Sequence, residues 1–122
     1  DSMTKMTKVF VSTAFLFFAS HAIACDYPPS PKNLPNGSTA TKDEMLAGVK
    51  VISKYQEDMA TYLSCIEAEE VVAIQALADD DEEGKQQRKA MFDKKYNAAV
   101  DEQTRTVEQF NVEIRAYKAK AD

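Results

Sequence analysis

Apolar residues recur at steps of three and four over two long segments of the chain, which is the spacing of one face of an α-helix. In residues 41–78 these positions are Met45, Val49, Ile52, Tyr55, Met59, Tyr62 or Leu63, Ile66, Ala73 and Leu77. Around residues 85–120 they are Phe92, Tyr96, Ala99 or Val100, Val107, Phe110, Ile114, Tyr117 and Ala121, with Gln103 as a polar interruption. Stripes of this kind pack helix against helix, so the pattern predicts two long helices.

The ends of these segments carry boundary signals. Thr41 followed by Glu44 matches a capping box at the start of the first helix. Residues 79–84, Asp-Asp-Asp-Glu-Glu-Gly, interrupt the apolar pattern as a loop between antiparallel helices does. They lack the spacing of an EF-hand calcium loop, so we interpret them as a solvated acidic loop that also favours the N-terminus of the second helix.

The predicted fold is therefore all-α: a long antiparallel two-helix hairpin with coiled-coil-like packing. A turn centred near residue 82 implies that facing residues have numbers that sum to about 164. This register places Ile66 near Ala99 and Met59 near Val107. A hairpin of two helices is thin, because each helix covers only one side of the other.

Residues 25–40 hold all four prolines and an Asn36-Gly37 turn signal, which predicts an extended, Pro-rich N-terminal arm. Composition alone also fits a disordered linker. Extended, the arm reaches up to about 50 Å, whereas Thr41 to Cys65 spans about 36 Å of helix. The arm can therefore fold back along the hairpin and bring Cys25 to Cys65. The arm residues that could then cover the open side of the helix pair are Tyr27, Pro28, Pro29 and Leu34.

Residues 1–24 match an export signal. Two lysines precede the apolar run Val9–Ala19, and Ala22-Ile23-Ala24 supplies small residues at the minus-three and minus-one positions of a cleavage site. We predict cleavage between Ala24 and Cys25 and a periplasmic or secreted protein; an uncleaved N-terminal anchor or a buried core helix is the alternative. The apolar run is shorter than the roughly 20 residues that span a bilayer. Asp1 and Ser2 precede the first methionine and belong to neither the predicted signal nor the predicted fold.

The mature chain would have two cysteines, Cys25 and Cys65. Ala22-Ile23-Ala24-Cys25 approximates a bacterial lipoprotein box, although Ala22 stands where Leu is usual. Acylation of Cys25 would leave Cys65 as a lone thiol in an oxidising compartment. An even cysteine count in a small exported protein is typical of a disulfide. The favoured prediction is a Cys25–Cys65 disulfide, and the alternative is a lipid-anchored envelope protein acylated at Cys25.

Charge and composition narrow the function. Without residues 1–24 the 15 basic and 20 acidic residues become 13 and 19, a net charge of −6. This sign argues against nucleic-acid binding, and it gives no support for adhesion to an anionic membrane. Membrane contact is expected only if Cys25 is acylated or the signal is retained, and charged partners should be basic in part.

The mature chain also lacks histidine, because His21 lies in the signal. Its absence removes the commonest general base and metal ligand. The chain has no Cys-x-x-Cys motif and no Gly-rich phosphate loop. We therefore expect no catalytic site, no metal and no cofactor, and a protein that is not an enzyme.

Several short motifs give a family resemblance. They are Leu34-Pro35-Asn36-Gly37, Ala40-Thr41, Met45-Leu46-Ala47, Tyr62-Leu63-x-Cys65, Tyr96-Asn97-Ala98-Ala99-Val100 and Phe110-Asn111-x-x-Ile114-Arg115-Ala116-Tyr117-Lys118. With the exported start and the Pro-rich arm, this pattern resembles a group of uncharacterised small exported proteobacterial proteins over nearly the whole mature chain. The resemblance implies the compartment and a helical fold and supplies no activity. The two cysteines of that group match Cys25 and Cys65, which favours the disulfide over acylation.

The leading functional hypothesis is a non-enzymatic exported helical hairpin, a protein-interaction or accessory subunit of a cell-envelope assembly. It follows from the packing stripe, the rod shape and the lack of catalytic groups. The surroundings of Asn111, Arg115 and Tyr117 and the Pro-rich arm are candidate contact surfaces. The expected partner is an unidentified protein or a second copy of the chain.

Overall fold

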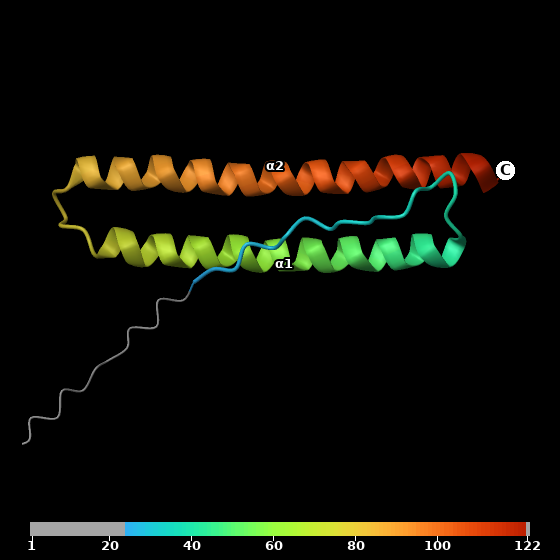
Figure 1. Cartoon of the computed structure of the whole chain (residues 1–122). Coiled ribbons are helices and arrows are strands. Elements are labelled where there is room, and N and C mark those ends of the chain that lie inside the picture. Colours follow the sequence, from blue (N-terminus) through green and yellow to red (C-terminus); the bar gives the residue numbers. More distant parts are fainter. Residues whose placement is uncertain (1–23, 122) are drawn as a thin grey trace, which may run out of the picture.

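The structure of the protein is a computed structural model that describes residues 24–121. It consists of two long antiparallel helices and an extended arm, α1 (Lys42–Gln75) and α2 (Glu82–Ala121), with the arm ahead of α1 (Figure 1). The helices have 34 and 40 residues, which correspond to lengths of about 51 and 60 Å. The predicted all-α hairpin is confirmed. The export signal predicted for residues 1–24 falls, apart from Ala24, outside the described part of the chain.

The capping box that begins α1 forms as predicted. The Thr41 hydroxyl accepts a hydrogen bond from the backbone N–H of Glu44 at 3.2 Å, and the Glu44 carboxylate accepts one from the backbone N–H of Thr41 at 3.4 Å. Two N–H groups that a helix start leaves without partners are thereby satisfied. The sequence therefore fixes where the arm ends and α1 begins.

The loop lies three residues earlier than residues 79–84. α1 ends at Gln75, where the N–H groups of Ala76 and Leu77 bond to Val72 O and Ile74 O. α2 already begins at Glu82, because the Asp81 carboxylate accepts a hydrogen bond from Gly84 N at 2.9 Å and so acts as the N-cap. The second half of the acidic run thus belongs to the first turn of α2, where negative charge is favourable.

The register shifts with the loop. Gly48 lies against Phe110, and Glu70 forms an ion pair with Arg88, so facing residue numbers sum to 158 rather than to about 164. Ala99 still packs in one cluster with Ile66 and Met59. The prediction that Met59 faces Val107 is wrong by about two turns, because Met59 packs with Ala99 and Val107 packs in the next cluster toward the free end of the hairpin.

The core follows the predicted stripes in two clusters. The first, nearer the loop, contains Tyr55, Met59, Tyr62, Ile66 and Ala99. The second, at the free end, contains Ala40, Met45, Ile52 and Phe110. Met59 and Ala99 are fully buried, which marks the level at which the helices pack most closely.

The arm folds back along the groove between the helices, as predicted, and Figure 1 shows it running from the free end to the middle of α1. A turn at residues 36–40 reverses the chain: Asn36 O accepts hydrogen bonds from Thr39 N at 3.1 Å and Ala40 N at 2.8 Å. Gly37 is required in this turn, because a Cβ there would lie 1.8 Å from the backbone oxygen of Glu113 on α2. The arm thus approaches α2 backbone to backbone.

We expect the substitution Gly48→Ala to destabilise the protein by about 1–3 kcal/mol, because it overpacks the site. A Cβ at Gly48 would lie 2.8 Å from the Phe110 ring and 2.9 Å from Cγ of Pro35 in the arm. Alanine in place of glycine inside a free helix would instead stabilise it by about 1 kcal/mol. Urea unfolding followed by circular dichroism measures the difference. Ala60→Gly, at an exposed position of α1, calibrates the helix-propensity term. A gain of stability for Gly48→Ala would show that the arm does not pack on α1.

Candidate functional site

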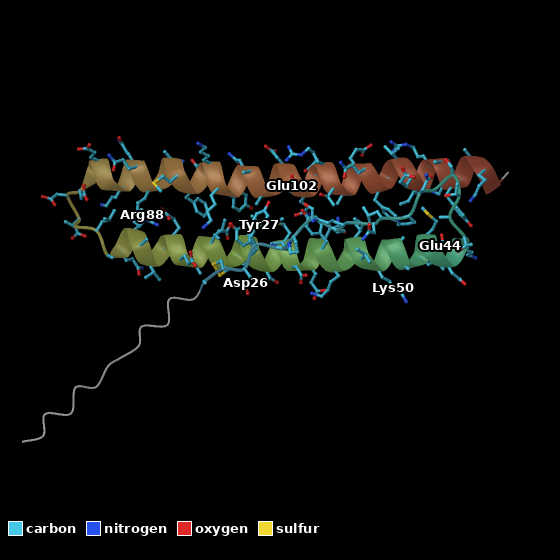
Figure 2. The ribbon with its side chains drawn as sticks, viewed as in Figure 1. Asp26, Tyr27, Glu44, Lys50, Arg88 and Glu102 are labelled. Carbon is cyan, nitrogen blue, oxygen red and sulfur yellow. A yellow bond between two sulfur atoms is a disulfide. The ribbon has the colours of Figure 1, made fainter. Side chains whose placement is uncertain are left out.

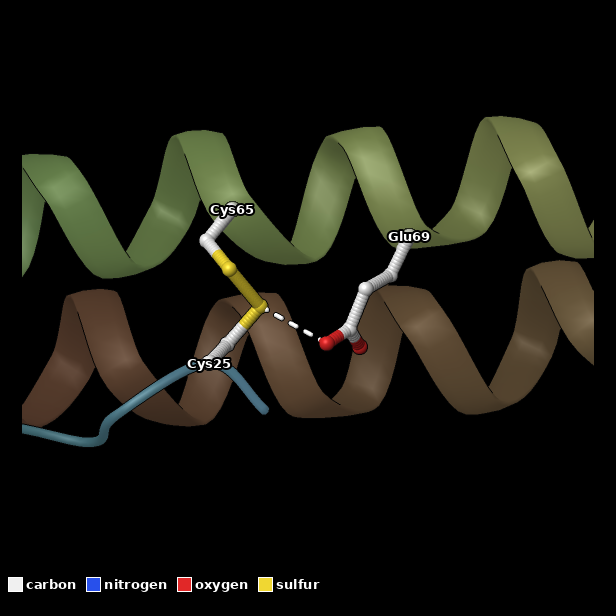
Figure 3. Close-up of side chains that lie close together, drawn as sticks. All are labelled: Cys25, Cys65 and Glu69. Atoms are coloured by element: carbon white, nitrogen blue, oxygen red, sulfur yellow. Dashed lines mark hydrogen bonds between the residues drawn. A yellow bond between two sulfur atoms is a disulfide. The ribbon is translucent and has the colours of Figure 1, made fainter. Parts of the chain in front are cut away.

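A disulfide between Cys25 and Cys65 fastens the start of the arm to the middle of α1 (Figure 3). The Cα atoms are 5.7 Å apart and the residues are 40 positions apart in sequence. This confirms the pairing predicted from the cysteine count and from the reach of the arm. Both cysteines of the chain are used, so the oxidised protein has no free thiol.

Glu69 lies beside this disulfide, one helical turn beyond Cys65, with its Oε1 2.9 Å from Sγ of Cys25 (Figure 3). Neither sulfur of a disulfide carries a proton, so Cys25 cannot donate a hydrogen bond to an ionised Glu69. The Glu69 carboxylate is therefore in direct contact with the disulfide.

The sulfur atoms of Cys25 and Cys65 and a carboxylate oxygen of Glu69 all lie within 4.8 Å of one another. Such a group could ligate a soft metal ion if both cysteines were thiolates. In the disulfide the sulfurs are joined to each other and carry no charge, so this cluster is a covalent fastening rather than a metal centre.

Polar and aromatic contacts hold the middle of the arm. The Tyr27 ring packs edge-on against Tyr62, with ring centroids 5.0 Å apart, and lies between the helices (Figure 2). Ser30 Oγ donates a hydrogen bond to Glu102 Oε1 at 2.6 Å. This bond, followed by one from Arg105, lowers the pKa of Glu102, whereas burial is the main cause that raises the pKa of Tyr27. The contact with Tyr62 joins the arm to α1, and the contact with Glu102 joins it to α2.

The free end of the hairpin is closed by two further bonds. Gly37 N donates a hydrogen bond to the Glu113 carboxylate at 2.7 Å, and Lys120 Nζ donates one to Ala40 O at 2.6 Å. Leu34 packs against the free-end core cluster. The arm therefore binds α1 and α2 together on one side, which we call the front face.

The opposite side carries a second apolar stripe, the open face. Gln56 and Leu63 on α1 each come one position after a residue that is buried or faces the arm. One position is a rotation of about 100° around the helix, so these two side chains lie toward the opposite side. The open face consists of Val49, Gln56, Leu63, Val71, Ile74, Phe92, Tyr96, Val100, Gln103, Val107 and Ile114. Val49, Val71 and Val100 are 44%, 56% and 37% exposed. An exposed apolar stripe along both helices is typical of an interaction surface.

Two hollows lie on the open face. One, near the loop, has a volume of about 510 Å³ and is lined by Glu67, Glu70, Val71, Ile74, Gln75 and Phe92. The other, at mid-length, has a volume of about 350 Å³ and is lined by Gln56, Gln103, Thr104, Val107 and Glu108. The first is apolar with acidic edges, whereas the second is centred on two glutamines. Both could receive side chains of another helix.

The three residues predicted as a contact surface do not share one face. Arg115 donates a hydrogen bond to Glu108 at 3.0 Å, and this bond, followed by one from Asn111, lowers the pKa of Glu108. Tyr117 instead packs against the free-end core and carries Lys120 Nζ 4.9 Å from its ring centroid. Asn111 and Arg115 thus lie together on the surface of α2, and Tyr117 supports the fold.

The loop end of the hairpin is strongly acidic. Residues 66–92 contain eight acidic and three basic residues, a net charge of −5. Arg88 pairs with Glu70 across the helices at 2.9 Å, near the loop in Figure 2. Residues 40–50 and 110–121, at the free end, contain three acidic and five basic residues, a net charge of +2. The rod therefore carries opposite net charges at its two ends.

No family model, curated protein or solved structure matches this chain. Within residues 24–121 neither helix is long and apolar enough to cross a membrane.

Sequence reasoning missed the open face, although several of its residues had been assigned to the apolar stripes. Val49, Leu63, Val100 and Val107 were assigned to the packing stripe, or offered as alternatives to Tyr62 and Ala99, and only the arm's position shows which member of each pair remains uncovered.

Replacing both Cys25 and Cys65 by serine should lower the free energy of unfolding by about 4 kcal/mol, the chain-entropy value for a loop of this length. Urea unfolding of the variant and of the oxidised wild type measures this loss. The wild type treated with a dithiol reductant is the matched control and should unfold with the variant. Trypsin should also cut at Lys32 in both of these forms faster than in the oxidised protein. Equal stability of all three would contradict a structural role for the disulfide.

Proposed function

We propose that this chain is an exported, non-enzymatic helical hairpin that works by binding protein, as an interaction or accessory subunit of a cell-envelope assembly. The observation that carries the proposal is the open face. It leaves valine, leucine, isoleucine and aromatic side chains partly exposed along both helices, while the arm covers the other side of the same pair. A protein partner that covers this stripe removes the apolar surface from water.

The compartment is supported by the disulfide. Bonds of this kind persist in oxidising, extracytoplasmic compartments and are rare in reducing ones. The Cys25–Cys65 bond begins at the residue that follows the predicted cleavage site, Ala24-Cys25. Cleavage there would make the first residue of the mature protein part of its fastening.

Binding rather than catalysis is supported by the chemistry of the surface. Both cysteines are joined in the disulfide, and the one histidine of the chain is His21. Hydrogen bonds from Ser30 and Arg115 lower the pKa values of Glu102 and Glu108, respectively. These groups serve ion pairs and hydrogen bonds within the fold.

The alternative, a lipoprotein acylated at Cys25, requires the same sulfur atom as the disulfide. Acylation of this kind forms a thioether at the cysteine, so Sγ of Cys25 cannot also bond to Cys65. The two states therefore exclude each other in any one molecule, and a mass measurement distinguishes them.

Protein recovered from the envelope of cells that express the full chain should begin at Cys25 and contain the disulfide. Its intact mass should match residues 25–122 less two hydrogens, and reduction should add the mass of those two hydrogens. The Cys25→Ser variant should be exported too and show no change on reduction. A mass increased by acyl chains would support the lipoprotein, and retained residues 3–24 would support the uncleaved anchor; either result would refute the soluble stapled form.

A photo-cross-linking residue in place of Val100 should capture a protein in living cells, because this position lies at the middle of the open face. The same residue in place of Val112 is the matched control, since Val112 is a 47% exposed valine on the same helix but off the open face. Adducts are identified by mass spectrometry after purification. Absence of any adduct at Val100, with the fold intact by circular dichroism, would refute a protein-binding function for this face.

A further inference from the structure

The order of residues along the open face is partly symmetric, and this symmetry indicates which partner covers it. We infer that two copies of this chain pack open face to open face, with their long axes antiparallel, and form a four-helix bundle whose outer sides are covered by the two arms. The inference rests on the proposed function and specifies the partner. Three observations carry it: the order of residues along each stripe, the charge at the two ends and the size of the face.

Part of the stripe on each helix is arranged symmetrically about one glutamine. On α1, Val49 and Leu63 lie seven residues to either side of Gln56. An antiparallel second copy whose two-fold axis passes at the level of Gln56 therefore places Leu63 opposite Val49 of the second copy, and the reverse. Such an interface is isologous, as two-fold symmetry requires.

The stripe on α2 has the same symmetry about Gln103. Phe92 and Ile114 lie eleven residues to either side of it, and Val100 and Val107 lie three and four residues away. Ile114 of the second copy would then enter the apolar hollow of about 510 Å³ beside Phe92. The open face thus supplies both the hollow and, from the second copy, the side chain that fills it.

Gln56 and Gln103 mark a common level, because both line the mid-length hollow of about 350 Å³. At the two-fold axis each glutamine meets its own symmetry mate, and the amides can donate to and accept from one another across the interface. A polar layer in an otherwise apolar helix interface selects one register and one orientation, since any slip leaves the amides against apolar side chains.

The charges favour the antiparallel orientation over the parallel one. In the antiparallel pair the loop end, with net charge −5, lies over the free end of the second copy, with net charge +2. A parallel pair would place two acidic loop ends side by side, and like charges in an interface disfavour association. The charge distribution thus selects the same arrangement as the residue order.

The face is large enough for a stable dimer. Two helices side by side, each about 50 Å long and about 10 Å wide, offer a face of about 1,000 Å² per copy, and a standard interface needs about 800 Å² per partner. The front face cannot compete for a second copy, because the arm occupies it and the disulfide fastens the arm there. Association therefore involves the open face alone.

Sedimentation equilibrium of the oxidised mature protein tests the inference, with a dimer as the expected result at micromolar concentration. Val100→Asp introduces two unpaired carboxylates into each dimer and should weaken association by about 100-fold or more. Val112→Asp, on the same helix but off the open face, should leave the dimer unchanged. Circular dichroism and thermal unfolding of both variants confirm that each remains folded. A monomer at all concentrations, or equal effects of the two variants, would overturn the inference.

The register is tested by cross-linking. Gln103→Cys should form a disulfide-linked dimer on mild oxidation, because each residue 103 meets its own mate at the two-fold axis. Gln109→Cys, which lines the hollow beside the arm on the front face, is the matched control and should not. A stable dimer without the Gln103→Cys cross-link would overturn the antiparallel register.

The photo-cross-linking adduct at Val100 separates this inference from the proposed function. An adduct with the mass of two copies supports both. An adduct with a different protein, together with a monomer in sedimentation, supports the proposed function and overturns the dimer. No adduct refutes the proposed function itself.

Discussion

Two helices packed side by side form a layer with two exposed faces, and this geometric constraint governs the rest of the structure. Each helix covers only one side of its neighbour, so the side chains at the edges of the interface between the helices remain partly exposed to solvent. In this chain the arm covers one face, by contacts that reach the two helices at Tyr62, Glu102 and Glu113. The other face stays partly exposed to water.

The arm needs its covalent fastening because its own contacts are few. Sixteen residues without helix or strand lose conformational entropy on ordering, about 1–2 kcal/mol for each backbone unit. One edge-on aromatic pair and a few hydrogen bonds return about 0.5–1.5 kcal/mol each. The disulfide reduces the freedom of the arm in the unfolded chain as well. Glu69 lies in contact with Sγ of Cys25 in this disulfide.

Local signals in the sequence predicted the fold where they were decisive. The Thr41–Glu44 box located the start of α1, and the cysteine count together with the reach of the arm predicted the Cys25–Cys65 pairing. The loop was misplaced because five consecutive acids do not show which of them is the N-cap; Asp81 takes that role through its bond to Gly84 N. The register error followed directly from the misplaced loop.

The candidate site could not be predicted in the same way. Tyr62 and Leu63 are adjacent, and periodicity accepts either as the seam residue; which one stays uncovered depends on the side that the arm takes. That side is set by three-dimensional contacts, such as Gly48 admitting Pro35, that no spacing rule contains. Glu69 was likewise invisible, because a glutamate on a charged helix is ordinarily a solvent-facing residue.

The arm has a second consequence once the open face binds another copy. A two-helix layer that is apolar on both sides would associate without limit, because every added layer would present a new apolar face. Open-ended association of this kind leads to fibres. In the proposed dimer the arm already covers one face of each copy, so pairing uses the open face. The same segment that completes the core of the monomer would therefore limit the proposed assembly to two copies.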